Sequence, residues 1–251
     1  MAERKAIVPV SELEKAILFS RVPLSLRGYL TDPQRTGIIA EFKRRSPSKG
    51  VINDRVDPAT VTRAYAAHGA SCLSVLTDGH FFGGSVEDLQ QARVNEIPIL
   101  RKDFTIDPYQ VLEAKAIGAD VILLIAACLE PEQVKSLAGL ARSLGMEVLL
   151  EIHNEAELGH ICDETEIVGV NNRDLKTFTV DVERSVALSR QIPAEKITVA
   201  ESGISKVETI LYLKNFGFRG FLIGENFMKE EDPGAAFGNF VQELKGVREN
   251  V

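Results

Sequence analysis

Six polar side chains share one kind of position in this sequence: each lies at the C-terminal end of a short apolar run. They are Glu41, Lys43, Lys102, Glu151, Asn171 and Glu201. A positioned ammonium group can protonate a developing oxyanion, and a carboxylate can move a proton at another step. Each charge left unpaired in an apolar interior costs several kcal/mol, so opposite charges must interleave. Such packing also displaces pKa values. The set predicts an acid–base site; the alternative is a group of ordinary salt bridges.

These positions depend on a repeated unit. Eight short apolar runs alternate with longer segments of helical periodicity, at a spacing of roughly 20–35 residues, which suits a strand, a crossover helix and two loops. The runs cover residues 37–42, 72–77, 97–102, 121–126, 147–152, 167–171, 196–200 and 220–223. Helix starts are predicted at Asp57-Pro58, Ser85, Asp107-Pro108 and Glu130-Pro131, and helix ends at Gly69, Gly118, Gly145 and Gly217.

Eight such units without a long linker predict one α/β domain over residues 1–251, a (β/α)8 TIM barrel. The C-terminal ends of all barrel strands meet at one mouth, so the six polar residues would line one cavity. An open doubly wound sheet is the alternative, but it would be large for one layer and no G-x-G-x-x-G follows the first run. Residues 1–36 carry amphipathic stretches at 11–20 and 24–30. We expect them to form an N-terminal helical extension that caps the barrel.

Three loops have the composition of an anion site. The loop at 43–50 is basic, rich in hydroxyl groups and restrained by a proline, and the loops at 201–204 and 223–226 contain glycine. Glycine lets backbone N–H groups approach an anion, and phosphate binding at the last two strand–helix loops recurs in TIM barrels. Phe82 and Phe104 fall in loops at the same mouth, either as core residues or as an apolar wall for a planar group.

Composition excludes several classes of function. The net charge is −7, which argues against a general nucleic-acid or anionic-membrane binder. No apolar run reaches the roughly 18 residues of a membrane span, and residues 1–5 do not resemble a secretory signal. The three cysteines, Cys72, Cys128 and Cys162, lack C-x-x-C spacing. They predict buried thiols in a reducing compartment, and we expect a cytoplasmic protein.

The remaining charged and imidazole groups suggest no metal. His68, His80, His153 and His160 lack the spacing of metal ligands. A metal held by the three glutamates is disfavoured by the nearby ammonium groups. Arg44, Arg45 and Asp103 are interpreted as solvated loop charges.

Taken together, the motifs resemble indole-3-glycerol-phosphate synthases of tryptophan biosynthesis, from about residue 11 to the end of the chain. The segments that carry the resemblance are Glu-Phe-Lys-x-x-Ser-Pro-Ser-Lys-Gly at 41–50, Leu-Arg-Lys-Asp-Phe at 100–104, Leu-Leu-Glu-Ile-His at 149–153, Gly-Val-Asn-Asn-Arg-Asp-Leu at 169–175, Ala-Glu-Ser-Gly-Ile at 200–204 and Leu-Ile-Gly-Glu at 222–225. Their order along the chain makes the resemblance specific, whereas no single segment would.

The resemblance implies a carbon–carbon lyase. Its substrate would be 1-(2-carboxyphenylamino)-1-deoxyribulose 5-phosphate, a sugar phosphate with an anthranilate moiety. Ring closure with loss of carbon dioxide and water would give indole-3-glycerol phosphate. The family needs no cofactor. We expect a monomer or weak homo-oligomer that binds neither nucleic acid nor membrane.

The resemblance also implies roles for individual residues. Lys102 would protonate the ketone as the ring closes, and Glu151 would transfer a proton during dehydration. Lys43 would contact the substrate carboxylate and act as a second general acid, and Glu41 would orient both lysines. Asn171 and Glu201 would hold the anilino and hydroxyl groups. The binding residues would be Arg173 at the carboxylate, Ser46, Ser202, Gly203, Gly224 and Glu225 at the phosphate, and Phe82, Phe104, Leu175 and Leu222 around the ring.

Three rival functions remain. A class I aldolase would use Lys102 or Lys43 as a Schiff-base nucleophile. A sugar-phosphate isomerase would need one acid and one base but no aromatic pocket. A phosphate-binding module without catalysis would tolerate the loss of Lys102 and Glu151.

Overall fold

The computed structural model describes residues 2–174 and 179–248 and contains the eight strands that the apolar runs predict. Their bounds are β1 Ile38–Phe42, β4 Cys72–Leu76, β5 Ile99–Lys102, β6 Val121–Ile125, β7 Glu147–Ile152, β8 Ile167–Asn171, β9 Ile197–Glu201 and β10 Phe218–Ile223. Each strand pairs in parallel with its neighbours, and β10 pairs with β1. The sheet is therefore a closed barrel, and the open doubly wound sheet is excluded.

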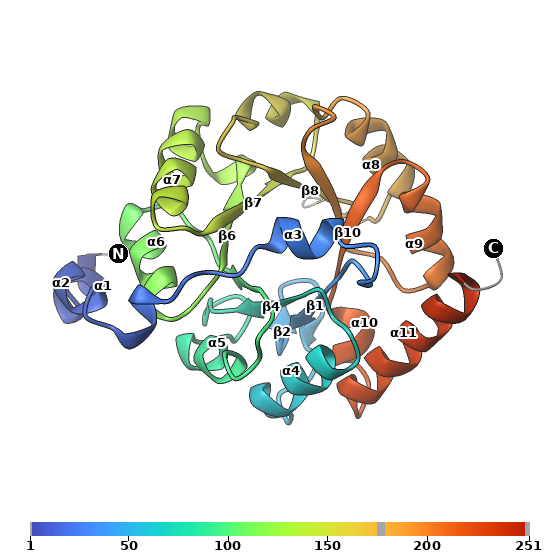
Figure 1. Ribbon diagram of the computed structural model, residues 1–251, viewed down its shortest axis with the longest axis horizontal. Helices are drawn as coiled ribbons and strands as arrows, with labels where there is room; N and C mark the ends of the chain where they lie inside the picture. The colour runs from blue at the N-terminus through green and yellow to red at the C-terminus, as the bar shows by residue number, and fades with distance from the viewer. Residues whose placement is uncertain (1, 175–178, 249–251) are drawn as a thin grey trace.

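Helices surround the barrel (Figure 1). They are α4 Pro58–Ala67, α5 Val86–Ala92, α6 Pro108–Ala116, α7 Pro131–Ser143, α8 Val182–Ser189, α9 Val207–Lys214 and α11 Pro233–Arg248. Shorter turns follow three strands: η2 Ala126–Cys128, η3 Glu155–His160 and α10 Glu225–Met228. The loop after β1 forms a small hairpin of β2 Arg45–Ser46 and β3 Gly50–Val51.

The predicted helix boundaries have the expected local chemistry. The side chain of Ser85 caps α5 by accepting from the N–H of Asp88, and Asp107 caps α6 in the same way. The four glycines predicted to end helices all have positive φ, a conformation that side chains disfavour. They are Gly69, Gly118, Gly145 and Gly217.

Alternate side chains of each strand face the lumen, and they form an apolar floor below a polar mouth. On β5, Leu100 belongs to the buried cluster at the floor, and Lys102, two residues on, lines the mouth cavity. Leu149 and Glu151 repeat this arrangement on β7. The floor cluster comprises Leu26, Leu30, Ile39, Cys72, Leu100, Val121, Leu123, Leu149, Ile167, Ile197, Val199 and Leu222. The same period of two that builds the core therefore places the charges above it.

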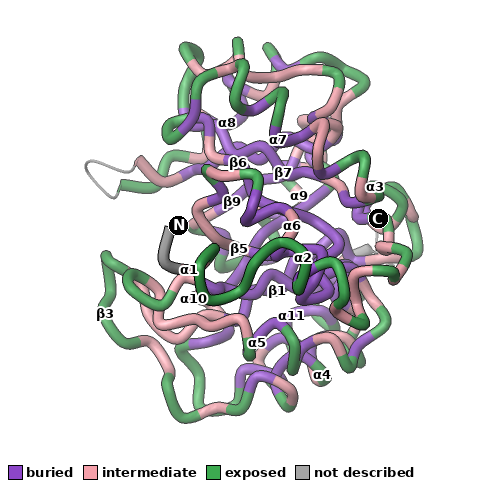
Figure 2. The backbone as a smooth tube through the Cα atoms, turned by 90° about the vertical axis from the view of Figure 1, so that its left-hand side faces the viewer, coloured by how far each residue is buried: buried purple, intermediate pink, exposed green. Residues whose placement is uncertain are grey.

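The N-terminal segment caps the barrel with only one of its elements. Helix α3 Leu26–Thr31 lies across the barrel in Figure 1, and its buried Leu26 and Leu30 join the floor cluster. Figure 2 shows α3 and the β3 hairpin at opposite sides of the molecule. The earlier elements α1 Ala2–Ile7, α2 Val10–Leu13 and η1 Ile17–Ser20 do not cap the lumen: α2 and η1 pack against α6. The expectation that the whole extension caps the barrel is correct for α3 and wrong for the rest.

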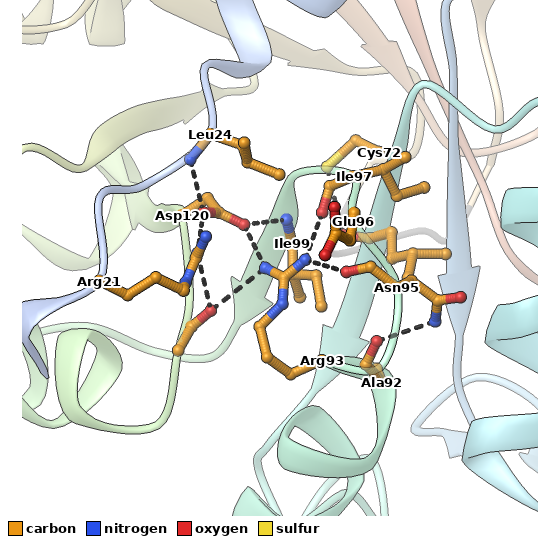
Figure 3. A network of polar contacts seen from close by, with 12 residues as sticks. Arg21, Leu24, Cys72, Ala92, Arg93, Asn95, Glu96, Ile97, Ile99 and Asp120 are labelled. Atoms are coloured by element: carbon orange, nitrogen blue, oxygen red, sulfur yellow. Dashed lines mark hydrogen bonds and ion pairs between the residues drawn. The ribbon is translucent and has the colours of Figure 1, made fainter. Parts of the chain in front are cut away.

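Asp120, just before β6, joins this cap to the barrel (Figure 3). Its fully buried carboxylate lies 2.6 Å from Nη1 of Arg93 and also pairs with Arg21. It accepts from the backbone N–H of Leu24 at 2.7 Å and of Ile99 at 2.8 Å. One carboxylate therefore satisfies donors from the N-terminal segment, from the end of α5 and from β5.

The cysteines depart in part from the sequence-based prediction. Cys72 is buried, Cys162 is half-buried and Cys128 is exposed. The prediction of a buried thiol is wrong for Cys128, because it ends η2 and lines the open cavity at the mouth of the barrel. No helix in the described ranges, 2–174 and 179–248, is long and apolar enough to cross a membrane.

Candidate active site

A cavity of about 580 Å³ opens at the C-terminal ends of the barrel strands. This volume suits a small organic substrate. The predicted site residues that lie in the described part of the chain all line it: Glu41, Lys43, Ser46, Phe82, Lys102, Phe104, Glu151, Asn171, Arg173, Glu201, Ser202, Gly203, Leu222, Gly224 and Glu225. Leu175 lies outside the described residues.

Lys102 forms the centre of the charged group. Its Nζ lies 3.4 Å from Glu201, 3.7 Å from Glu151 and 3.9 Å from Glu41. Burial alone would lower the pKa of Lys102, but the three carboxylates outweigh burial and raise that pKa. Lys102 is therefore a cation at neutral pH and holds a transferable proton.

Lys43 forms a second ammonium contact with the same group. Its Nζ donates to Glu41 Oε1 at 2.7 Å, while Ser74 Oγ donates to Glu41 Oε2 at 3.1 Å. Burial would raise the pKa of Glu41, yet the charges of Lys43 and Lys102 outweigh burial and lower it. Glu41 is thus an anion that both lysines share.

The pKa values of the other two carboxyl groups, Glu151 and Glu201, are shifted in opposite directions. Glu151 accepts from Asn171 Nδ2 at 2.9 Å, and its pKa is lowered because Lys102 and a neighbouring histidine outweigh burial. Burial and the charge of Glu151 raise the pKa of Glu201 well above its usual range. Two nearby carboxyl groups with divergent pKa values are typical of acid–base sites.

Aromatic rings form one wall of the cavity. The rings of Phe82 and Phe104 lie 6.3 Å apart, and Phe81 packs edge-on to Phe104 at 5.9 Å. Phe81 is 49% exposed, although it lines the cavity. A large exposed ring beside an acid–base group is suited to hold a planar apolar group.

The loop after β9 has an unusual backbone conformation. Ser202 has φ 70° and Gly203 has φ 71°, so two successive residues are left-handed. Asn172 Nδ2 donates to the carbonyl of Ser202 at 2.7 Å and supports this conformation. A left-handed non-glycine residue costs roughly 1–3 kcal/mol and persists where surrounding contacts enforce it. Across the mouth, Arg173 and Lys49 each lie 3.7 Å from the Glu225 carboxylate.

The three residues predicted to be solvated loop charges instead make hydrogen bonds and ion pairs within the protein. Arg44 forms a two-pronged pair with Asp88, and Arg45 donates to the carbonyls of the loop at 79–80. The side chain of Asp103 is only 9% exposed and accepts from Arg101 at 3.0 Å. The prediction is wrong because the loops after β1, β4 and β5 pack against one another, which their separate positions in the sequence do not show.

Two important side chains were not predicted. Arg101 is 1% exposed and lies 2.6 Å from Glu113 of α6, so it faces the helix layer behind Lys102. The strand period contains a signal for this, since neighbours on a strand face opposite sides. His153 lies 3.0 Å from Glu151, and only its position two residues beyond Glu151 in the sequence hints at that contact.

The described ranges contain no group of three or more His, Cys, Asp or Glu side chains arranged to hold a metal ion. The expectation that the reaction needs no cofactor stays a prediction.

Comparison with known proteins identifies the family. The family model for indole-3-glycerol phosphate synthase matches residues 1–240. This chain belongs to the indole-3-glycerol phosphate synthase family. An indole-3-glycerol phosphate synthase of Bacteroides thetaiotaomicron is 47% identical over 243 residues, covering 96% of this chain and 93% of the relative. One of Albidiferax ferrireducens is 45% identical over 228 residues, covering 90% of this chain and 86% of the relative.

Solved structures support the fold. The alpha subunit of tryptophan synthase from Legionella pneumophila superposes with a TM-score of 0.62 at 14% identity, covering 85% of this chain and 93% of that one. A mutant alpha subunit from Pyrococcus furiosus gives 0.61 at 16% identity, covering 83% and 97%. The predicted TIM barrel with N-terminal helices is confirmed.

Proposed function

We propose that the chain catalyses the reaction of its family, as a carboxy-lyase of tryptophan biosynthesis. The substrate is 1-(2-carboxyphenylamino)-1-deoxyribulose 5-phosphate, and the product is indole-3-glycerol phosphate. The family membership and the joint presence of an acid–base group, an aromatic wall and a glycine-containing loop in one cavity support this function.

Lys102 acts as the general acid in ring closure. As the aromatic carbon attacks the ketone, negative charge develops on the carbonyl oxygen, and an ammonium group stabilises and protonates it. Three carboxyl groups surround Lys102, and the two whose pKa values are lowered, Glu41 and Glu151, keep it charged. Carbon dioxide then leaves without a base, because its loss restores the aromatic ring.

Glu151 carries the proton transfer of the dehydration. Loss of the hydroxyl group as water requires one group that donates a proton and another that accepts one. Glu151 Oε2 lies 3.7 Å from Lys102, so the two groups act on neighbouring atoms of the intermediate. Glu41 orients Lys43 and Lys102, and Asn171 and Glu201 hold the anilino and hydroxyl groups.

Binding uses the two sides of the cavity. Phe82, Phe104 and Leu222 pack around the anthranilate ring, whose carboxylate meets Lys43 and Arg173. The phosphate lies at Ser46 and at the loops after β9 and β10, where residues 203, 224 and 225 offer backbone N–H groups. Cytoplasmic location and a monomeric or weakly associated state stay predictions.

The single observation that carries the mechanism is Lys102 enclosed by three carboxylates beside the aromatic wall. The test is a fluorescence assay for indole formation from the anilino-ribulose phosphate, with wild type, Lys102→Ala and Lys43→Ala. We expect Lys102→Ala to lower kcat by about 10²-fold or more, with an unchanged circular dichroism spectrum. Near-normal turnover of this variant would remove Lys102 from the acid role.

Three further measurements separate the rival functions. A Schiff-base enzyme would be trapped covalently on its carbonyl substrate by borohydride. An isomerase would act on sugar phosphates without the anilino ring, and a binding module would form no product.

A further inference from the structure

The imidazole of His153 lies between two carboxylates at the edge of the active site. Its Nε2 is 3.0 Å from Glu151 Oε1, and its Nδ1 is 3.2 Å from Glu157 Oε2. The residue is 8% exposed. Its ring therefore links the proposed proton carrier on β7 to a carboxylate of η3 that has no contact with the substrate cavity.

Glu157 is itself firmly held. Its Oε2 accepts from the backbone N–H of His153 at 2.7 Å, and its Oε1 accepts from Asn154 Nδ2 at 2.7 Å. Asn154 in turn caps η3 by accepting from the N–H of Ala156 at 3.0 Å. The outer carboxylate is thus fixed by the turn that follows β7, and the imidazole is fixed between two anchored groups.

The two oxygens of Glu151 have separate surroundings. Oε1 lies beside His153 and accepts from Asn171, whereas Oε2 points to Lys102. An unrestrained carboxylate would exchange its two oxygens by rotation. Here Oε1 accepts a hydrogen bond from Asn171 and lies in ion-pair contact with His153, so Oε2 is left for the reacting atoms.

We propose that His153 is a positioning residue for the reaction: it holds Glu151 Oε1, directs Oε2 to Lys102 and the substrate, and supplies a positive charge that keeps Glu151 ionised. The inference rests on the proposed role of Glu151. His153 is not among the residues that line the cavity, so it acts through Glu151 and not on the substrate.

The electrostatic surroundings support a charged imidazole. Burial would lower the pKa of His153, but Glu151 and Glu157 outweigh burial and raise it to about 10. The other groups near these carboxylates are Lys102 on β5, which pairs with Glu151, the carboxyl group of Glu201 on β9, and the Cys128 thiol on η2. Burial and the charges of both carboxylates raise the pKa of that thiol, so it stays neutral at neutral pH. His153 is then the cation that lies between the two acids.

The test is the pH dependence of kcat for His153→Gln against wild type, in the indole-formation assay. A neutral amide removes the charge, so Glu151 takes up its proton at a pH higher by about 1 unit or more. We expect the ratio of variant to wild-type kcat to be constant near pH 7 and to fall below about pH 5, where Glu151 of the variant takes up its proton first, with KM little changed. A merely structural role would lower kcat by the same factor at every pH.

His160→Gln is the matched control. His160 lies on the same turn, but its ring nitrogens lie 3.1 and 2.9 Å from the backbone carbonyl oxygens of Glu157 and Leu129. Its variant loses polar contacts of similar length that involve no carboxylate, and we expect its pH profile to match wild type.

A second measurement needs no folded His153 variant. Nitrogen NMR of the wild-type imidazoles, assigned with Gln variants of the other three histidines, should show His153 doubly protonated at about pH 8, well above the ordinary pKa of histidine. A neutral His153 at that pH, or superimposable pH profiles of His153→Gln and wild type, would overturn the inference. Failure of wild type to form product would instead overturn the proposed function.

Discussion

Removal of the Asp120 carboxylate is a severe test of how the N-terminal cap is joined to the barrel. Asp120 is fully buried, and Arg93 beside it is 8% exposed. The variant Asp120→Ala leaves the Arg93 guanidinium without its carboxylate and leaves the N–H groups of Leu24 and Ile99 without their acceptor (Figure 3). Arg93 retains only backbone carbonyls, including that of Ile97 at 2.7 Å.

The magnitude follows from these losses. Breaking a buried ion pair by removing one partner costs about 3–5 kcal/mol. Each orphaned buried donor costs about 1–3 kcal/mol on its own, but these costs overlap with relaxation and with entry of water. We therefore expect Asp120→Ala to lower the free energy of unfolding by about 4 kcal/mol. For a chain of this length that corresponds to a fall in Tm of roughly 8–16 °C.

The assay is urea unfolding followed by far-ultraviolet circular dichroism, with the same slope required for both proteins. The control is Glu12→Ala, which removes a surface pair to Lys15 whose side chains are 55% and 69% exposed. We expect the control to change stability by less than about 0.5 kcal/mol. Because Asp120 lies at the end of the barrel opposite the cavity, kcat of the folded Asp120→Ala protein should stay near wild type. A loss of stability below about 1 kcal/mol would refute the argument that this carboxylate joins the cap to the barrel.

Two further predictions concern the cavity. Ser202→Asp should raise KM about tenfold or more with little change in kcat, because a carboxylate near the phosphate costs about 1–4 kcal/mol of binding energy. Aspartate tolerates the positive φ of 70° at this position, so the backbone should be unchanged. An unchanged KM in steady-state kinetics would place the phosphate elsewhere. Gly169→Ala would place a Cβ 2.1 Å from Glu201 Oε1, so it should displace the Glu201 side chain from Lys102. We expect kcat to fall by about 10-fold to 10²-fold. A kcat equal to wild type would show that Glu201 can move without loss of activity.

Much of the fold was predictable because its signals are local. The β-branched runs, the Asp-Pro and Ser helix starts and the glycine helix ends each depend on a few neighbouring residues. The polar ends of the strands followed as well, since a period of two places Glu41 above Ile39 and Lys102 above Leu100. Parallel strands in a closed barrel must end at one mouth, so these side chains had to meet.

Other features required the tertiary structure, because they depend on contacts between distant segments. Arg44 pairs with Asp88, and Asp103 accepts from Thr77, in each case from a different strand–helix unit. The sequence therefore predicted Arg44 and Asp103 to be solvated, whereas neighbouring loops largely enclose them. The position of α1 and α2 beside α6, rather than under the barrel, was decided by packing and by contacts such as Lys5 with Asp107.

The distances within the charged group also lay beyond the sequence. Residue types and spacing specified that Lys102 and Glu151 face one lumen, but not how far apart they lie. Barrel closure brings them to 3.7 Å, within a network that includes His153. Side-chain period is a property of each strand alone, whereas the separation of two side chains depends on the stagger of strands and the choice of rotamers, which only the complete barrel determines.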